Sequence, residues 1–378
     1  MTRSLSDIAL DADTRSAEID ELRRLPTDLV ADLAATGVFK RWVPKDYGGD
    51  QAAMTEGLCD IETTARANGS VGWCVMIAMT TGLTAALLPA EHADAVFGAP
   101  DAITGGFAMP AGTGTVGERG IRATGRWSWG SGTDHCTSIG GGLRLVDASG
   151  EPFRRGSGTV FAFFDRDDVE LLDTWRVGGL RGTASNDYTV TDAFVPEGRW
   201  IDVVTRPEPI VDDPLYRFSF FGALAAGVAS VLLGLGRRAI DELIALGEKV
   251  PVGGSRSLAN RPVVQASLAE ADAAVRSARA FLHSTVTECW DSVAAGGTVT
   301  DEERRLLRLA ATNAAERCAH AVDLCHRAAG GTSVFETSPL LRVFRDTHVA
   351  TQHGMVAPAT NEVTGRMAFG LPTMTFTL

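Results

Sequence analysis

The chain has 378 residues, of which 45% are apolar and 22% are charged, as in ordinary globular enzymes of two or three domains. Its 35 Lys and Arg residues face 47 Asp and Glu residues, and this net charge of −12 disfavours nucleic acid as a partner. The six cysteines show no CxxC spacing, which predicts reduced thiols and neither a disulfide framework nor a zinc site. The first fifteen residues lack the apolar run of a signal peptide, so we expect a cytoplasmic protein.

Helical patterns dominate from about residue 15 to residue 105. Residues 25–42 carry apolar side chains at three- and four-residue steps, until Pro44 and Gly48 with Gly49 interrupt the pattern. Residues 52–66 and 71–97 continue in the same way, and the second run is almost wholly apolar, which predicts burial. We therefore predict an all-helical first domain over residues 1–105.

Short β-rich runs punctuated by Gly and Asp follow, and they predict a small β-domain over residues 106–205. Residues 160–164 and 188–195 are enriched in β-branched and aromatic side chains, as strands are. Residues 112–117 satisfy the pattern GxGxxG, but a turn and a strand follow instead of a helix. This pattern therefore predicts a glycine-rich turn and not a dinucleotide-binding loop.

Helical patterns return over residues 206–378, where we predict a four-helix bundle. Residues 263–290 and 300–327 each have the length of a bundle helix. Residues 218–236 contain no charge over a length that would span a membrane. Their many small residues and the amphipathic continuation after Arg238 favour a buried core helix, so we predict no membrane contact.

Several motifs have the spacing of a known family. Gly330 and Gly331 precede the pair Arg345-Asp346 by fifteen residues, residues 43–49 read VPKDYGG, and residues 173–183 read DTWRVGGLRGT, with DAFVPEGR following shortly after. Together with the order of helical, β and helical regions, these motifs resemble the acyl-CoA dehydrogenase superfamily, and residues 173–183 resemble its flavin-dependent hydroxylase branch. The resemblance implies an N-terminal helical domain, a central β-barrel-like domain and a C-terminal four-helix bundle, assembled as a homotetramer or homodimer.

One departure from the dehydrogenase pattern concerns the catalytic carboxylate. Eight residues after Arg345, where the dehydrogenases carry Tyr and then their catalytic Glu, this chain has His353 and Gly354. The family's other position for this base, near the start of the first bundle helix, falls in residues 216–222, which are aromatic and contain no acid. A dehydrogenase needs a carboxylate to remove the α-proton of an acyl thioester. The resemblance therefore implies a two-component monooxygenase.

In such an enzyme, reduced FAD or reduced FMN arrives from a separate NAD(P)H-dependent flavin reductase. It reacts with molecular oxygen to a flavin C4a-hydroperoxide, which hydroxylates an aromatic or indole-like small molecule. The resemblance places Ser131 at the flavin N5, where its hydroxyl protects the peroxide, and His353 beside the substrate, where it takes a phenolic proton or holds the distal oxygen. It adds these cofactor-binding candidates: Phe107, Met109, Trp129, Arg256, Gln265, Gly330 and Gly331.

Some alternatives stay open. Ser131 also fits an ordinary strand serine, Trp129 fits core packing, and His353 fits a histidine hydrogen-bonded inside a helix. Arg256 and Gln265 suit the cofactor phosphates, a neighbouring subunit or plain surface equally. His348 lies five residues before His353, which is not a same-face spacing, so we predict no metal site.

The substrate is also left open. Many phenol hydroxylases of this branch carry a second histidine nine residues after the Gly of a Gly-Trp pair, and here Gly72-Trp73 puts Thr81 there. The lack of this base leaves room for an indole or an amine. Competing functions are an N-oxygenase acting on an amino sugar, an acyl-CoA dehydrogenase-like flavin oxidoreductase and a non-catalytic binding protein of the same fold.

Overall fold

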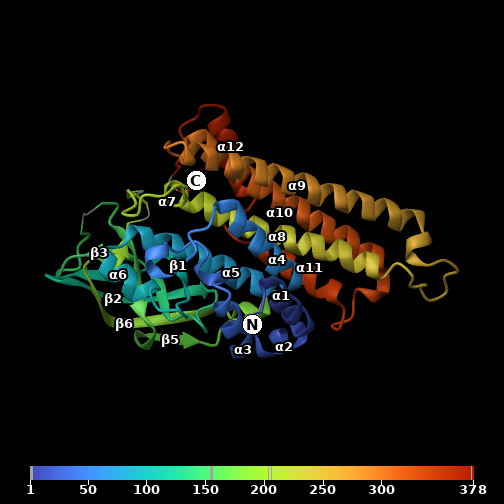
Figure 1. Ribbon diagram of the computed structural model, residues 1–378, viewed down its shortest axis with the longest axis horizontal. Coiled ribbons are helices and arrows are strands. Elements are labelled where there is room, and N and C mark those ends of the chain that lie inside the picture. The colour runs from blue at the N-terminus through green and yellow to red at the C-terminus, as the bar shows by residue number, and fades with distance from the viewer. Residues whose placement is uncertain (1–2, 154–155, 203, 206, 376) are drawn as a thin grey trace.

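Helices occupy both ends of the chain and strands its middle in the computed structural model, in the order that the sequence predicts (Figure 1). The structure describes residues 3–153, 156–202, 204–205, 207–375 and 377–378. The strands lie at one end of the molecule, the long C-terminal helices extend beyond them to the other end, and N-terminal helices lie between the two (Figure 1). The domain boundaries at residues 105 and 205 stay predictions.

The N-terminal region contains six α-helices and three short 3-10 helices. The first α-helix begins at a capping box in which Ser4 and Asp7 satisfy each other's backbone amides, and the fifth begins at Asn68, whose side chain accepts from two backbone amides. The structure divides the predicted run 71–97 into three helices, and Pro89 separates the last of these from the other two. The elements are α1 (Leu5–Thr14), α2 (Ser16–Leu22), α3 (Thr27–Ala35), η1 (Val38–Lys40), η2 (Lys45–Tyr47), α4 (Met54–Ala67), α5 (Gly69–Gly82), η3 (Leu83–Leu87) and α6 (Ala90–Phe97).

The middle region is one seven-stranded sheet with the strand order β5-β6-β2-β1-β3-β4-β7. Strands β1 and β3 pair in parallel, and the other neighbours pair antiparallel. The strands β5 and β7 are at the two ends of this order, and β4 also contacts β6, which is not its neighbour, so the sheet is strongly curved, as expected of a barrel-like domain. The strands are β1 (Thr104–Val116), β2 (Gly120–Gly130), β3 (Ser138–Val146), β4 (Thr159–Asp165), β5 (Val169–Leu172), β6 (Asn186–Pro196) and β7 (Trp200–Ile201), with the 3-10 helices η4 (Arg166–Asp168) and η5 (Arg181–Thr183).

The predicted glycine-rich turn over residues 112–117 is wrong in one respect. Residues 112–116 belong to β1 and pair with β2, and residues 112–115 also pair with β3, so most of the motif is strand. Gly112 and Gly114 suit this central position, because a Cβ on Gly112 would come within 2.5 Å of the buried Trp127 ring.

The C-terminal region is a bundle in which α8 packs against α9, α10 and α11 and also against α4 and α5. The predicted helices over residues 263–290 and 300–327 correspond to α9 and α10. The region contains α7 (Pro214–Arg217), α8 (Phe220–Ala245), η6 (Leu258–Asn260), α9 (Pro262–Ala294), α10 (Asp301–Ala329), η7 (Gly330–Thr332), α11 (Pro339–Ala350) and α12 (Ala359–Ala368).

Two helical segments are long and apolar enough to cross a membrane. They are Gly69–Leu87 and Phe220–Ala245, and 89% and 78% of their most apolar windows lie buried inside the protein. The charge-free segment over residues 218–236 thus supplies the N-terminal two thirds of α8, which is buried as expected for a core helix. Helix α5 is the second such helix, and it contacts β1, α8 and α11, so it joins the sheet to the bundle.

Candidate functional site

Ser131 lies in the turn that follows β2, beside the N-terminal half of α5. Its side chain is buried, and its hydroxyl accepts a hydrogen bond of 3.0 Å from Nε1 of Trp73. The same hydroxyl lies 2.7 Å from Oγ of Ser185, in the segment between η5 and β6. Three segments far apart in sequence therefore meet at the residue that we predicted to contact the flavin.

The motif over residues 173–183 forms the loop that brings Ser185 to this point. A Cβ on Gly179 would lie 2.3 Å from the carbonyl oxygen of Arg345, and a Cβ on Gly182 would lie 2.1 Å from Cγ2 of Ile19. The two glycines therefore allow the loop to lie directly on α11 and α2. This close packing explains why the motif has glycine at these two positions.

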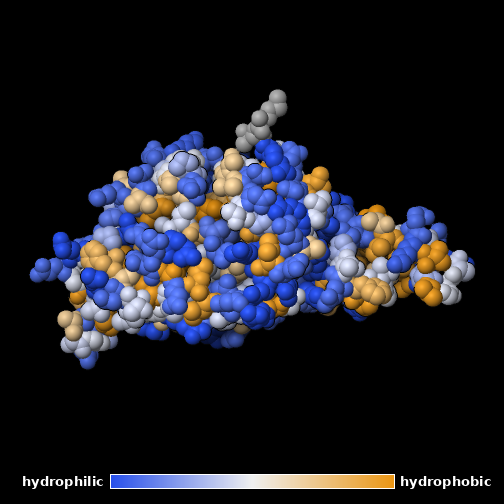
Figure 2. Space-filling view, turned by 90° about the horizontal axis from the view of Figure 1, so that it is seen from below, coloured by the Kyte–Doolittle hydropathy of each residue, from blue (hydrophilic) through white to orange (hydrophobic). Residues whose placement is uncertain are grey.

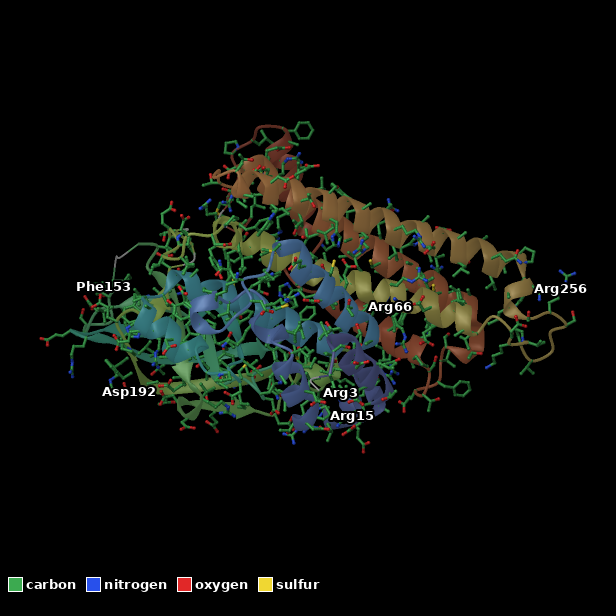
Figure 3. The ribbon with its side chains drawn as sticks, viewed as in Figure 1. Arg3, Arg15, Arg66, Phe153, Asp192 and Arg256 are labelled. Carbon is green, nitrogen blue, oxygen red and sulfur yellow. The ribbon has the colours of Figure 1, made fainter. Side chains whose placement is uncertain are left out.

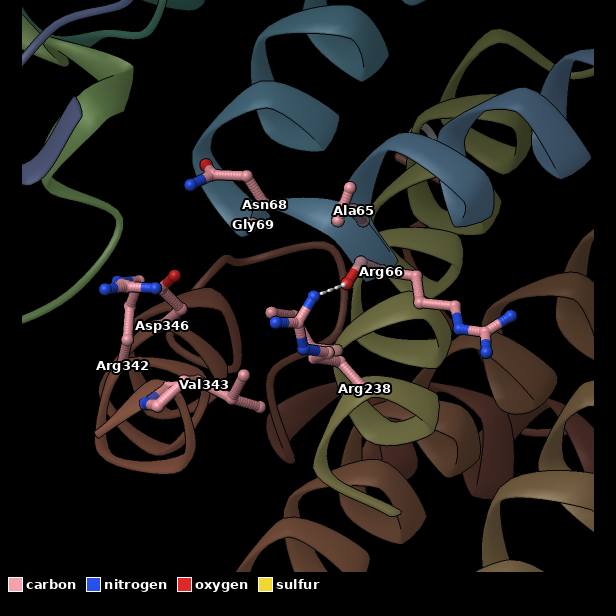
Figure 4. A pocket seen from close by; sticks show the side chains of 11 residues that line it. Ala65, Arg66, Asn68, Gly69, Arg238, Arg342, Val343 and Asp346 are labelled. Atoms are coloured by element: carbon pink, nitrogen blue, oxygen red, sulfur yellow. Dashed lines mark hydrogen bonds between the residues drawn. The ribbon is translucent and has the colours of Figure 1, made fainter. Parts of the chain in front are cut away.

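Asp346 of the Arg-Asp pair fixes the middle of that loop. Leu180 adopts a left-handed conformation with φ of 49°, and its amide donates a hydrogen bond of 2.6 Å to Oδ1 of Asp346. Asp346 also borders a small recess that Asn68, Gly69 and Arg342 line (Figure 4). Burial raises the pKa of the Asp346 carboxyl to about 7.

His353 lies in the turn that follows α11, and not inside a helix. Its ring meets the Trp73 ring edge to face, with 5.5 Å between the centroids. The backbone amide of Met355 donates to its Nδ1 over 3.2 Å, which leaves the imidazole proton on Nε2. Burial, and secondly the Arg308 guanidinium, lower the pKa of His353 to about 4. His353 is thus a neutral imidazole whose Nε2–H is a donor, and Trp73 links it to Ser131.

The other predicted ring contacts lie on the sheet. Trp129 is 62% exposed and adopts a positive φ of 60°, and its ring lies 5.7 Å from that of Phe107. Met109 is 61% exposed, in a part of β1 where the register with β3 shifts. Two large apolar side chains are thus exposed beside Ser131's strand, which fits the cover that a planar isoalloxazine ring would need.

The remaining candidates do not lie with these residues. Arg256 is at the end of the bundle furthest from the sheet (Figure 3). Gln265 and the glycines Gly330 and Gly331 are also exposed, near the start of α9 and the end of α10. Gln265 donates a hydrogen bond of 2.8 Å to the carbonyl oxygen of Ala259. Within one chain these residues are separate from the site around Ser131.

Two further positions bear on the chemistry. The Thr81 hydroxyl donates a hydrogen bond of 2.8 Å to the carbonyl oxygen of Ile77 inside its own helix, so it is not a replacement for a histidine base. His135 lies in the loop after β2 and packs against Phe39 with 5.9 Å between the ring centroids. Burial lowers the pKa of His135 to about 4.

Sequence reasoning did not assign a role to Trp73, Thr183, Ser185 or the loop-fixing Asp346. The Gly-Trp pair and the Arg-Asp pair were visible as motifs, but their spacing gives no information on which side chains meet. Only the packing of α5 and α11 against the loop shows it.

The comparisons with known proteins agree with this geometry. The family model described as the acyl-CoA dehydrogenase N-terminal domain matches residues 8–90, and that of the C-terminal domain matches residues 226–358. The chain belongs to the acyl-CoA dehydrogenase family.

Within this family, the similar proteins are flavin-dependent monooxygenases. An indole-3-acetate monooxygenase from Pseudomonas putida is 32% identical over 94% of this chain and 90% of its own length. HsaA, the oxygenase subunit of a flavin-dependent monooxygenase from Rhodococcus jostii, is 29% identical over 95% of each chain. The structure of XiaF from Streptomyces with FADH2 and glycerol superposes with a TM-score of 0.91, at 26% identity over 98% of this chain and 96% of the other. The present chain is a flavin-dependent monooxygenase of this family.

Proposed function

We propose that this chain hydroxylates an aromatic small molecule, in particular an indole-like one, with reduced FAD or FMN that a separate NAD(P)H-dependent reductase supplies. When bound, reduced flavin provides the two electrons that activate molecular oxygen. In this proposal, Trp129, Phe107 and Met109 border the ring, and Ser131 holds its N5 edge.

The observation that carries the proposal is the contact of Trp73 with both Ser131 and His353. It joins the expected flavin side of the site to the expected substrate side through one indole ring. The group on the substrate side is a neutral imidazole, where a dehydrogenase would need a carboxylate. His353 offers its Nε2–H to an acceptor atom of the substrate or of oxygen. A base with a pKa near 4 and an occupied Nδ1 is poorly suited to remove a phenolic proton.

This limited basicity supports an indole-like substrate. Thr81 binds within its helix, and so neither it nor His353 is a suitable base for a phenol. An electron-rich indole reacts through carbon without prior deprotonation, and a relative at 32% identity acts on indole-3-acetate. We therefore place indoles before phenols and before the amines of an N-oxygenase.

The outer end of the bundle supports an assembly of several copies, and we propose the homotetramer that the family resemblance implies. Hydrophobic side chains gather on this projecting end (Figure 2). Among those exposed there are Ile244, Val250, Val252 and Val263. Arg256, Gln265, Gly330 and Gly331 lie in the same part of the bundle, and we infer that they serve a neighbouring subunit or its cofactor. We propose a cytoplasmic location, since both long apolar helices are core helices.

The test mixes the purified chain with photoreduced FAD or FMN, isotopically labelled oxygen and indole-3-acetate, with p-hydroxyphenylacetate as the phenolic comparison. One labelled oxygen atom in the indole product, detected by mass spectrometry, supports the proposal. Labelled product from the phenol but not from the indole would overturn the substrate preference. Hydrogen peroxide as the only product with both compounds would contradict the proposed substrate class.

A further inference from the structure

Five hydrogen-bonding groups form a buried row that runs from Trp73 through Ser131 to Leu180. Trp73 Nε1 donates to Ser131 Oγ over 3.0 Å, and Ser131 Oγ lies 2.7 Å from Ser185 Oγ. Ser185 Oγ lies 2.6 Å from Thr183 Oγ1, which in turn lies 2.9 Å from the carbonyl oxygen of Leu180. The three hydroxyl side chains are all buried, so water does not compete for these contacts.

The chemistry of the two ends determines in which direction the hydroxyl hydrogens of the row point. An indole N–H only donates and a carbonyl oxygen only accepts, whereas each hydroxyl between them has one hydrogen to donate. A hydrogen is present in all four contacts only if Ser131 donates to Ser185, Ser185 to Thr183, and Thr183 to Leu180. In the reversed arrangement, the contact between Thr183 and the Leu180 carbonyl has no hydrogen and is repulsive.

The far end of the row is held in place. The Leu180 amide donates to the buried Asp346 over 2.6 Å, and the Leu180 carbonyl also accepts from Nε1 of Trp175 over 3.0 Å. Leu180 is thus held through both its amide and its carbonyl oxygen, so the carbonyl does not turn away from Thr183. The direction of the hydroxyl row is therefore built into the loop over residues 173–183.

This direction determines what Ser131 offers to a ligand. Its hydrogen is committed to Ser185 and one lone pair is committed to Trp73, which leaves one lone pair as an acceptor. The N5 atom of an oxidised flavin is an acceptor, whereas that of a reduced flavin carries a hydrogen and donates. Only the reduced form matches Ser131 as the row presents it.

We propose that Thr183 and Ser185 are positioning residues that make the site select reduced flavin over oxidised flavin, by holding Ser131 as an acceptor. The inference rests on the proposed placement of the flavin N5 at Ser131. Oxidised flavin would bind only with the row reversed, at the loss of the hydrogen bond from Thr183 to Leu180. One net hydrogen bond corresponds to roughly a three- to tenfold change in a dissociation constant.

The experiment measures dissociation constants of the full chain for oxidised and photoreduced FAD and FMN, the latter under anaerobic conditions. The variants are Thr183→Val, which removes the last hydroxyl while keeping its shape, and Ser185→Ala. In both, the Ser131 hydrogen is free to turn towards an oxidised N5. We expect oxidised flavin to bind roughly three- to tenfold more tightly than in the unaltered chain, with little change for reduced flavin.

A gain of affinity for one redox state is a result that mere loss of structure does not give. Thr183→Ser restores the hydroxyl and should restore the preference. Thr64→Val is the matched control, because Thr64 is also buried and donates over 2.9 Å to a carbonyl within α4, away from the row. It should leave both constants unchanged.

The outcomes separate this inference from the proposed function. If both variants fold, bind reduced flavin and keep the original ratio of the two constants, the role of Thr183 and Ser185 is overturned. If Ser131→Ala leaves both constants and the ratio unchanged, the flavin does not lie at Ser131, and the proposed site is overturned with the inference.

Discussion

The surroundings of Asp346 predict how the stability of the fold changes with pH, in both direction and magnitude. It is buried, and its carboxyl faces the Leu180 amide, Asp20 of α2 and the α11 residues Arg342 and Arg345. Burial is the largest influence and raises the pKa to about 7 from the ordinary 3.8. The folded protein therefore holds this proton at higher pH than the unfolded chain does, and stability falls as the pH rises through this interval.

The magnitude follows from the linkage between the two pKa values. Once Asp346 is ionised in both states, the shift from 3.8 to about 7 costs about 4 kcal/mol of folding free energy. Somewhat more than half of this cost develops between pH of about 5 and about 8. Asp346→Asn keeps an oxygen for the Leu180 amide but carries no charge, so this pH dependence should vanish in the variant.

The assay is equilibrium urea unfolding of the flavin-free chain at several pH values in this range, with unaltered protein and variant side by side. The gain in stability of Asp346→Asn should grow by about 2 to 3 kcal/mol from the acidic to the alkaline limit. Asp173→Asn is the control, because the hydrogen bond from Arg23 lowers the pKa of Asp173, so that this carboxyl is ionised throughout the assayed range and its replacement should change stability equally at every pH. Parallel curves for Asp346→Asn and unaltered protein would refute the reasoning.

Three further predictions concern catalysis and packing. His353→Ala should lower hydroxylated product in a single turnover by roughly a hundredfold, with far less effect on flavin binding; an equal product yield would remove His353 from the mechanism. Because the pKa of His353 is about 4, the imidazole is neutral at every pH above about 6. The product yield should therefore not fall near pH 6.5 through protonation of His353. A fall near pH 6.5 in the unaltered protein that is absent in His353→Gln would contradict this. Gly182→Ala should destabilise the fold by about 2 kcal/mol in urea unfolding, since its Cβ would meet Ile19. The control Gly178→Ala should change stability little, because a Cβ there would meet no atom within 4 Å. Equal losses of stability in the two variants would contradict the close packing of this loop.

The sequence by itself determined the types and order of the elements, because helical and strand periodicities are local properties of the chain. The family resemblance of the sequence also implies that His353 stands where the dehydrogenases carry a catalytic carboxylate, through its spacing from Arg345. The sequence did not determine the order of the strands in the sheet, or that Arg256 lies far from the sheet, because these depend on how elements pack.

Only the tertiary structure decided which groups act together. The contact between Trp73 and Ser131 joins residues 58 positions apart, and that between Leu180 and Asp346 joins residues 166 positions apart. The sequence around each of these residues contains no pattern that would identify its partner. The direction of the hydroxyl row is a property of the folded loop. It arises only when folding places a fixed carbonyl at one end of the three hydroxyls and an indole N–H at the other end, both within hydrogen-bonding distance.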